Sequence, residues 1–228
     1  MIDNKGIIVG GKPCGSRDSV RYAQRYHRFV AINYLYESRH WRRQNILKNR
    51  EKELKKRKTF ETEIQQVKDD VLMLGGMVEQ SLLDSVEALK KRDIKASEKI
   101  SQFDGEINKK RFEIETQLMI LIATQQPMAH DLRLLASSME IISELERMGD
   151  YAKGIAKINI RMGDQPLLKP LIDIPRMAQK GADMLRRSLT AFINEDIETA
   201  RLLPVEDDEV DALYNQIYRE LSTFIIQD

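Results

Sequence analysis

Cysteine, aromatic residues and long apolar runs are all scarce in this 228-residue sequence. Its single cysteine, Cys14, excludes a framework of disulfide bonds and suits a reducing compartment. Aromatic residues make up 6% of the chain, too few for a typical β-sandwich or barrel. No apolar run approaches the ~20 residues that cross a bilayer, and the first residues lack a stretch of the signal-peptide type. We therefore expect a cytoplasmic protein.

The motifs of the common enzyme classes are also missing. A di-iron carboxylate bundle needs two inward-facing Glu-x-x-His strings, and the sequence has only Glu37-Ser-Arg-His40, which lies off any apolar stripe. We find no glycine-rich phosphate loop, no zinc-binding cysteine cluster and no pairing of a nucleophile with a base. We therefore expect a protein that is not an enzyme.

The charge of the chain is divided unevenly. Residues 1–58 contain 16 Lys and Arg against five Asp and Glu, a net charge of +11, whereas the remaining residues carry −10. This basic segment also contains several aromatic residues, so one interpretation is an arm for nucleic acid or an anionic membrane. The other is a disordered or non-native extension. Because the segment has no fold motif, we favour the extension for residues 1–58 and expect no nucleic-acid partner.

From Phe60 onward, apolar residues recur every three or four positions, the spacing of one buried helix face. Pro127 fits the first turn of a helix, where its missing N–H costs nothing. The spacing predicts helices over about 60–91, 93–124, 127–162, 174–194 and 196–228. Three long helices joined by short turns form an antiparallel bundle, which we assign to residues 59–163.

A second copy of this unit begins 103 residues later. At that shift Ala88 matches Ala191, and Asp93 matches Asp196. The second copy, over residues 164–228, stops before its third helix. We therefore predict an all-α fold of tandem antiparallel three-helix bundles, with the second bundle truncated after two helices.

The missing helix is expected to leave an apolar seam on the two helices that remain. Soluble monomers rarely tolerate a large exposed apolar surface. We therefore expect this chain to self-associate, as a homodimer. The seam residues are Met184, Leu185, Phe192, Leu213, Ile217, Phe224 and Ile225.

Four oxygen-bearing side chains are candidates for a metal site. Asp104 and Asn108 share one helix face because they are four residues apart, and so do Glu146 and Asp150. Residues 104 and 150 both lie 23 positions from Pro127, so they are expected at the same level of the hairpin.

Carboxylates that cluster at a half-buried seam repel one another unless a proton or a cation compensates. Such an oxygen-rich set suits a divalent ion such as Mg, Mn, Fe or Zn. The alternative is a solvated charged face, in which Arg147 pairs with Glu144 or another acid.

Three motifs occur in fixed order along the predicted first bundle. They are Gly-Gly-Met-Val-Glu at 75–79, Ala-Thr-Gln-Gln-Pro at 123–127 followed by Asp-Leu-Arg at 131–133, and Glu-Leu-Glu-Arg-Met-Gly-Asp at 144–150. Their order and spacing resemble the PhoU family of phosphate-signalling regulators over roughly residues 59–228. The resemblance implies tandem three-helix bundles in which acidic four-spaced pairs bind metal clusters. By that resemblance Asp104, Asn108, Glu146 and Asp150 serve one site, and Asp207 and Asp211 form one side of another.

The resemblance also implies a function. Members of that family are negative regulators that couple the phosphate ABC transporter, through its ATPase, to a sensor histidine kinase, and they reach the membrane only through these partners. This chain lacks the family's second Glu-x-x-x-Asp helix, and residues 1–58 match no part of the family pattern. A metal-free helical scaffold or adaptor is the alternative function.

Overall fold

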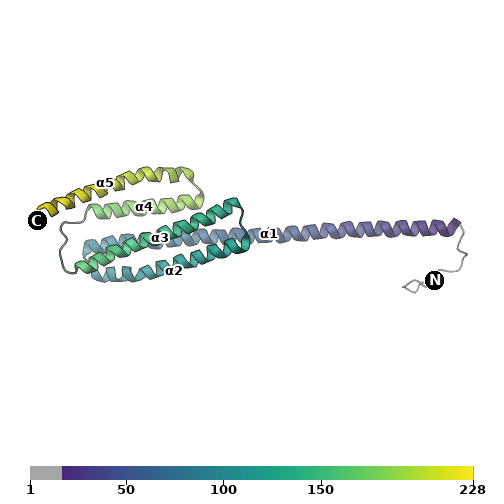
Figure 1. The fold of residues 1–228 in the computed structure, drawn as a ribbon, viewed down its shortest axis with the longest axis horizontal. Coiled ribbons are helices and arrows are strands. Elements are labelled where there is room, and N and C mark those ends of the chain that lie inside the picture. The colour runs from purple at the N-terminus through teal and green to yellow at the C-terminus, as the bar shows by residue number, and fades with distance from the viewer. Residues whose placement is uncertain (1–16, 228) are drawn as a thin grey trace. The chain divides into compact units, whose positions relative to one another are not determined.

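The computed structural model describes the backbone of residues 17–227 and the side chains of residues 45–224. The described residues contain no strand, and the chain forms the helices α1 (Arg17–Lys91), α2 (Ile94–Gln125), α3 (Ala129–Met162), α4 (Asp173–Asn194) and α5 (Ile197–Gln227) (Figure 1). The prediction of an all-α bundle fold is confirmed. The chain divides into two units, Met1–Thr59 and Phe60–Asp228, and the second contains all the predicted site residues.

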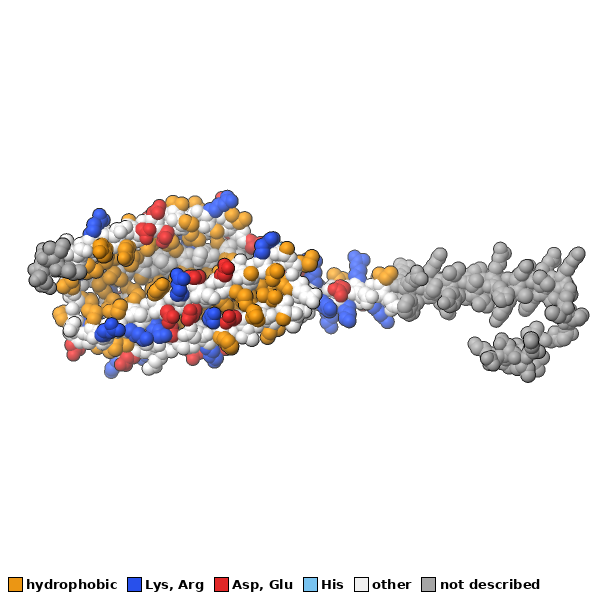
Figure 2. Space-filling view, in the orientation of Figure 1, with side chains coloured by type: hydrophobic (Ala, Val, Ile, Leu, Met, Phe, Trp, Pro, Cys, Tyr) orange, Lys and Arg blue, Asp and Glu red, His pale blue; other side chains and the backbone are white. Residues whose placement is uncertain are grey.

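Helix α1 begins at Arg17, well before the predicted start near residue 60. Residues 17–58 contain neither glycine nor proline and are rich in Arg and Lys, which favour helix. Side chains 46–59 are exposed, and Lys and Arg gather on this segment (Figure 2). Because none of that segment is buried, it has no apolar stripe to reveal a helix. The structure therefore differs from the expected disordered extension from Arg17 onward, and residues 1–16 lie outside the described residues.

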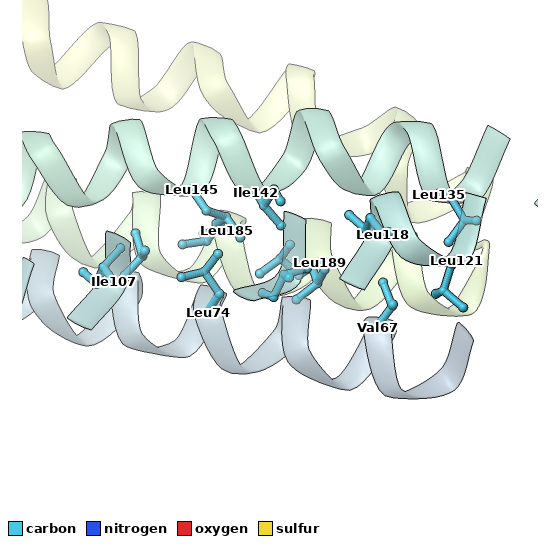
Figure 3. Packing of buried hydrophobic residues seen from close by; sticks show 13 residues of the cluster. Val67, Leu74, Ile107, Leu118, Leu121, Leu135, Ile142, Leu145, Leu185 and Leu189 are labelled. Atoms are coloured by element: carbon cyan, nitrogen blue, oxygen red, sulfur yellow. The ribbon is translucent and has the colours of Figure 1, made fainter. Parts of the chain in front are cut away.

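One apolar core joins the part of α1 after Phe60 to α2, α3 and α4 (Figure 3). Each helix contributes side chains at spacings of three, four or seven residues, which place them on one helix face, as the sequence predicts. Full burial of a Leu, Ile or Val contributes roughly 1.5–3 kcal/mol, so the set is the main source of stability for the bundle. The core residues are Val67, Val71, Leu74, Val78, Ile107, Ile114, Leu118, Leu121, Leu135, Ile142, Leu145, Leu185 and Leu189.

The turns between α1 and α2 and between α4 and α5 have the same geometry. The backbone N–H of Asp93 donates to the carbonyl of Ala88 at 2.9 Å, and that of Asp196 donates to the carbonyl of Ala191 at 2.8 Å. The residue before each aspartate is left-handed, with φ of 57° and 55°. Each aspartate also caps the next helix by accepting a backbone N–H three residues on. Ala88 and Ala191 match when the sequence is shifted by 103 residues, and so do Asp93 and Asp196.

Helix α4 packs against α1, and a glycine permits the close approach. Leu189 of α4 lies so near Gly75 that a Cβ built on the glycine would be 2.1 Å from the leucine Cδ1. A hydrogen bond also joins the two helices: Lys68 Nζ of α1 donates to the carbonyl of Ile193 in α4 at 3.1 Å. The second bundle therefore rests on the first through α1 and α4.

This packing changes the expected apolar seam on α4 and α5. Leu185, Leu213 and Ile217 are buried, because α4 uses the first bundle as a partner and α5 packs on α4. Other apolar residues of α5 stay exposed, among them Tyr214 and Tyr218. The side chain of Ile225 lies outside the described residues.

Candidate functional site

Asp104 is the most buried of the predicted site residues. It lies on the inward face of α2 between the buried side chains of Ile100 and Ile107, and only 5% of it is exposed. A carboxylate in this position is costly unless a cation or hydrogen-bond donors compensate its charge. The chain supplies both.

A lysine of α3 is the main partner of Asp104. The ammonium of Lys153 donates to Asp104 Oδ2 at 2.6 Å and lies 3.4 Å from Asp150 Oδ1. The amide of Asn108 donates to the same oxygen of Asp104 at 3.1 Å. Hydrogen bonding to Asp104 raises the pKa of the Lys153 ammonium above its usual value, and Asp150 adds to the effect. The lysine therefore stays charged.

These contacts bring three of the four predicted residues into one cluster, Asp104, Asn108 and Asp150. The equal spacing of residues 104 and 150 from Pro127 thus places both at the level of one lysine. Glu146, the fourth, is half-buried and forms no ion pair among the described side chains. We call these three residues and Lys153, together with Glu146 one helical turn before Asp150, the α2–α3 cluster.

A glycine lets α2 and α3 approach closely at this cluster. A Cβ built on Gly149 would lie 3.3 Å from two carbon atoms of Ile107. This distance is shorter than an ordinary van der Waals contact, so a larger residue here would push the helices apart. The glycine next to Asp150 therefore helps to set the spacing across which Lys153 reaches Asp104.

In this arrangement the cluster lacks a three-carboxylate group. Across the part of the chain that the structure describes, no three His, Cys, Asp or Glu side chains come close enough to hold an ion. The position between Asp104 and Asp150 is taken by the Lys153 ammonium, which already satisfies the carboxylate oxygen that an ion would use. The donor chemistry suits a divalent ion, but this placement of the donors does not.

The second predicted pair lies apart from the first. Asp207 and Asp211 are both exposed on α5, and neither forms an ion pair with another described residue. They occupy the same face as Tyr214 and Tyr218, because all four follow helical spacing. This exposed face of α5 has no covering helix among the described residues.

Neighbouring carboxylates of α5 are instead tied to α4. Arg187 binds Glu206 through both of its terminal nitrogens, and Lys180 pairs with Glu209. Hydrogen bonds from these cations lower the pKa of Glu206 and of Glu209 below their usual value. The pairs fix the α4–α5 hairpin at its solvent side.

Two polar residues of α3, the half-buried Lys153 and the fully buried Asn159, were not predicted from the sequence. Lys153 follows Asp150 by one helical turn, but a four-residue acidic pattern does not include it. Asn159 is fully buried, and its amide donates to Ser97 Oγ at 2.8 Å and to the carbonyl of Ala88 at 3.1 Å. Its position on the stripe of Ala152 and Ala156, which are also buried, is the signal that could have found it.

A family model described as PhoU domain matches residues 71–158 and 174–228. The two matches cover the first bundle and the α4–α5 hairpin, and both include predicted site residues. This chain belongs to the PhoU family. The resemblance carried by the three motifs is thereby confirmed.

Several named PhoU proteins are similar to this chain over most of its length. The phosphate-specific transport system accessory protein PhoU homolog of Aquifex aeolicus is 34% identical over 166 residues, which are 73% of this chain and 75% of that protein. The homolog of Clostridium acetobutylicum is 35% identical over 173 residues, covering 75% of this chain and 79% of the other. The accessory protein PhoU of Escherichia coli is 32% identical over 169 residues, covering 74% and 70%.

Two solved PhoU structures share the fold. The crystal structure of PhoU from Pseudomonas aeruginosa superposes with a TM-score of 0.70 at 29% identity, covering 74% of this chain and 81% of that one. The phosphate transport system regulatory protein PhoU from Streptococcus pneumoniae superposes with a TM-score of 0.68 at 28% identity, covering 74% and 80%. The PhoU fold thus covers about three quarters of this chain.

Proposed function

We propose that this chain is an accessory regulator of phosphate transport. The observation that carries the proposal is the similarity, over about three quarters of the chain, to proteins named phosphate-specific transport system accessory protein PhoU. The regulator acts by binding other proteins rather than by catalysis. Its helices present charged faces and short apolar rows, which suit contacts with partner proteins.

The specific regulatory role that we propose is also inferred from membership of the PhoU family. The chain represses phosphate uptake when phosphate is plentiful, by coupling the ATPase of the phosphate ABC transporter to a sensor histidine kinase. It acts in the cytoplasm, on the side of the membrane where ATP is hydrolysed, and it reaches the membrane through these partners. No helix in the described part of the chain is long and apolar enough to cross a bilayer.

A gene deletion in the native organism tests this function. We expect the deletion strain to take up phosphate at a high rate in phosphate-rich medium and to keep the kinase-controlled genes switched on. Expression of the chain from a plasmid should restore repression. If uptake and gene expression are unchanged by the deletion, the proposed function is wrong.

Self-association is a second part of the proposal. Tyr214 and Tyr218 of α5 are 58% and 64% exposed, and they lie one helical turn apart on the uncovered face. Burial of such aromatic side chains between two copies is favourable, since aromatic residues contribute much of the energy of protein interfaces. Light scattering at micromolar concentration should give the mass of a dimer, and Tyr218→Lys should shift it to a monomer. A monomeric mass for the unaltered chain would contradict this part.

Metal binding by the α2–α3 cluster is a third part. The cluster offers the carboxylates of Asp104, Glu146 and Asp150 and the amide of Asn108, a hard oxygen set that suits Fe, Zn, Mn or Mg. Asp207 and Asp211 offer one side of a second site. The placement of Lys153 favours the alternative of a metal-free scaffold, because the ammonium already compensates the buried charge of Asp104. Isothermal titration of the chelator-treated chain with Zn²⁺ distinguishes the two.

A further inference from the structure

The lysine in the α2–α3 cluster occupies the place of a cation. We propose that Lys153 is an internal cation that neutralises the acidic pair of the first bundle and keeps divalent ions from binding tightly there. This inference deepens the proposed metal binding and rests on it. The ammonium sits 2.6 Å from one carboxylate oxygen and 3.4 Å from another, on two different residues. A bound ion would occupy the same space.

The burial of Asp104 explains why the ammonium of Lys153 is held in place. The side chain of Asp104 is 7% exposed, so its charge is poorly compensated by water. Removal of one partner from a buried ion pair leaves an uncompensated charge, which is strongly unfavourable. The only other donor to the carboxylate among the described residues is the neutral amide of Asn108. The positive charge at this position therefore comes from Lys153.

The partial exposure of Lys153 and Asp150 explains why a divalent ion can compete with the ammonium. The side chain of Lys153 is 26% exposed and that of Asp150 is 51% exposed, so the cluster opens to solvent on one side. Lysine has a flexible stem of four carbons, which lets the ammonium leave while the helix stays in place. Without the ammonium, the carboxylates of Asp104 and Asp150 lose the cation that they share, and the vacated position favours a divalent ion.

Other cations nearby do not have this role. Lys157 lies one turn farther along α3 and is exposed. Arg147 pairs with Glu144 at 3.1 Å, and both side chains are more than half exposed. The lysine at 157 thus provides a matched control, with the same charge on the same helix but outside the cluster.

The test compares Lys153→Gln with Lys157→Gln in the full chain after chelator treatment. Isothermal titration with Zn²⁺ should show at least about tenfold tighter binding for Lys153→Gln than for the unaltered chain, because attraction between unit charges at such distances shifts affinities by that much or more. Lys157→Gln should bind as the unaltered chain does. Lys153→Arg, which keeps the charge, should also bind weakly. Equal affinities of the two glutamine variants would overturn the inference.

A second measurement needs no variant. In the unaltered chain with ¹³C-labelled lysine, saturation with Zn²⁺ should move the Cε signal of Lys153 to the position typical of the exposed Lys157. If Zn²⁺ binds and Glu146→Ala abolishes the binding while the Lys153 signal does not move, the role of the lysine is wrong and the metal site stands. If no form of the chain binds Zn²⁺, the proposed metal binding fails, and the exclusion by Lys153 fails with it.

Discussion

Asn159 offers the sharpest test of how the first bundle is held together. Its side-chain amide has two hydrogens, and the nitrogen lies 2.8 Å from Ser97 Oγ, 3.1 Å from the carbonyl of Ala88 and 3.3 Å from that of Asp93. Its carbonyl oxygen accepts from the guanidinium of Arg92. One fully buried side chain thus connects α3 to the end of α1 and the start of α2.

The cost of Asn159→Ala follows from these contacts. Two neutral hydrogen bonds contribute about 1 kcal/mol each, and a hydrogen bond to a charged group contributes roughly 1.5–3 kcal/mol. Their loss should lower the free energy of unfolding by about 4 kcal/mol, a large part of the ~5–15 kcal/mol of a typical domain. With a urea slope of about 2 kcal/mol per molar, the midpoint should fall by about 2 M.

Urea unfolding followed by far-UV circular dichroism measures this shift. Asn215→Ala is the matched control, because Asn215 is exposed on a helix and its replacement should change stability by less than about 0.5 kcal/mol. Asn159→Asp separates donors from shape: it keeps the volume and the acceptor for Arg92 but turns a carboxylate oxygen toward the backbone carbonyls. If Asn159→Ala costs no more than Asn215→Ala, or Asn159→Asp is harmless, the reasoning is wrong.

Three further predictions concern the interface between the bundles, pH and metal. Gly75→Ala should lower the free energy of unfolding by about 1–3 kcal/mol, because the added methyl group overpacks against Leu189 of α4. Gly76→Ala is the control: a Cβ built there has nothing within 4 Å, so the variant should gain about 0.5–1 kcal/mol. Thermal unfolding measures both changes. Because Arg187 lowers the pKa of Glu206 in the folded chain, that pair stabilises above the ordinary pKa of 4.5 and is lost as pH falls through the lower folded value. Urea midpoints between pH 7 and 3 should therefore fall less steeply for Glu206→Gln. In a Zn²⁺ titration Glu146→Ala should abolish most of the binding and Glu144→Ala should leave it intact; equal behaviour of the two would support the solvated charged face.

Helical periodicity predicted every helix of the bundle because burial repeats along each of them. The end of α1 near residue 91 and the start of α2 after Asp93 were within two residues of the structure, since the aspartate cap and the apolar stripe agree there. The start of α1 was missed because residues 46–59 are exposed on all sides. Periodicity detects a helix that packs, and a helix that does not pack carries no such signal.

The candidate site was only partly predictable for a similar reason. Counting from Pro127 placed Asp104 opposite Asp150 because two antiparallel helices keep the same rise per residue. The counting does not say which side chain bridges them, and Lys153, one turn beyond Asp150, is long enough to reach back. The packing of α4 against α1 was not predicted either, because it depends on the absence of a side chain at Gly75.

The shared core of α1 and α4 has a consequence for how this chain unfolds. Leu185 and Leu189 belong to the same apolar cluster as Val71 and Leu74, and the described side chains of the α4–α5 hairpin form no separate core of comparable size. Groups of residues that share one core open together, and their hydrogen exchange is governed by a common free energy. Amides at the centre of α4 should therefore show the same free energy of exchange as those of α1 around Leu74. The second bundle, although a sequence repeat of the first, is a cooperative extension of it and not an independent folding unit.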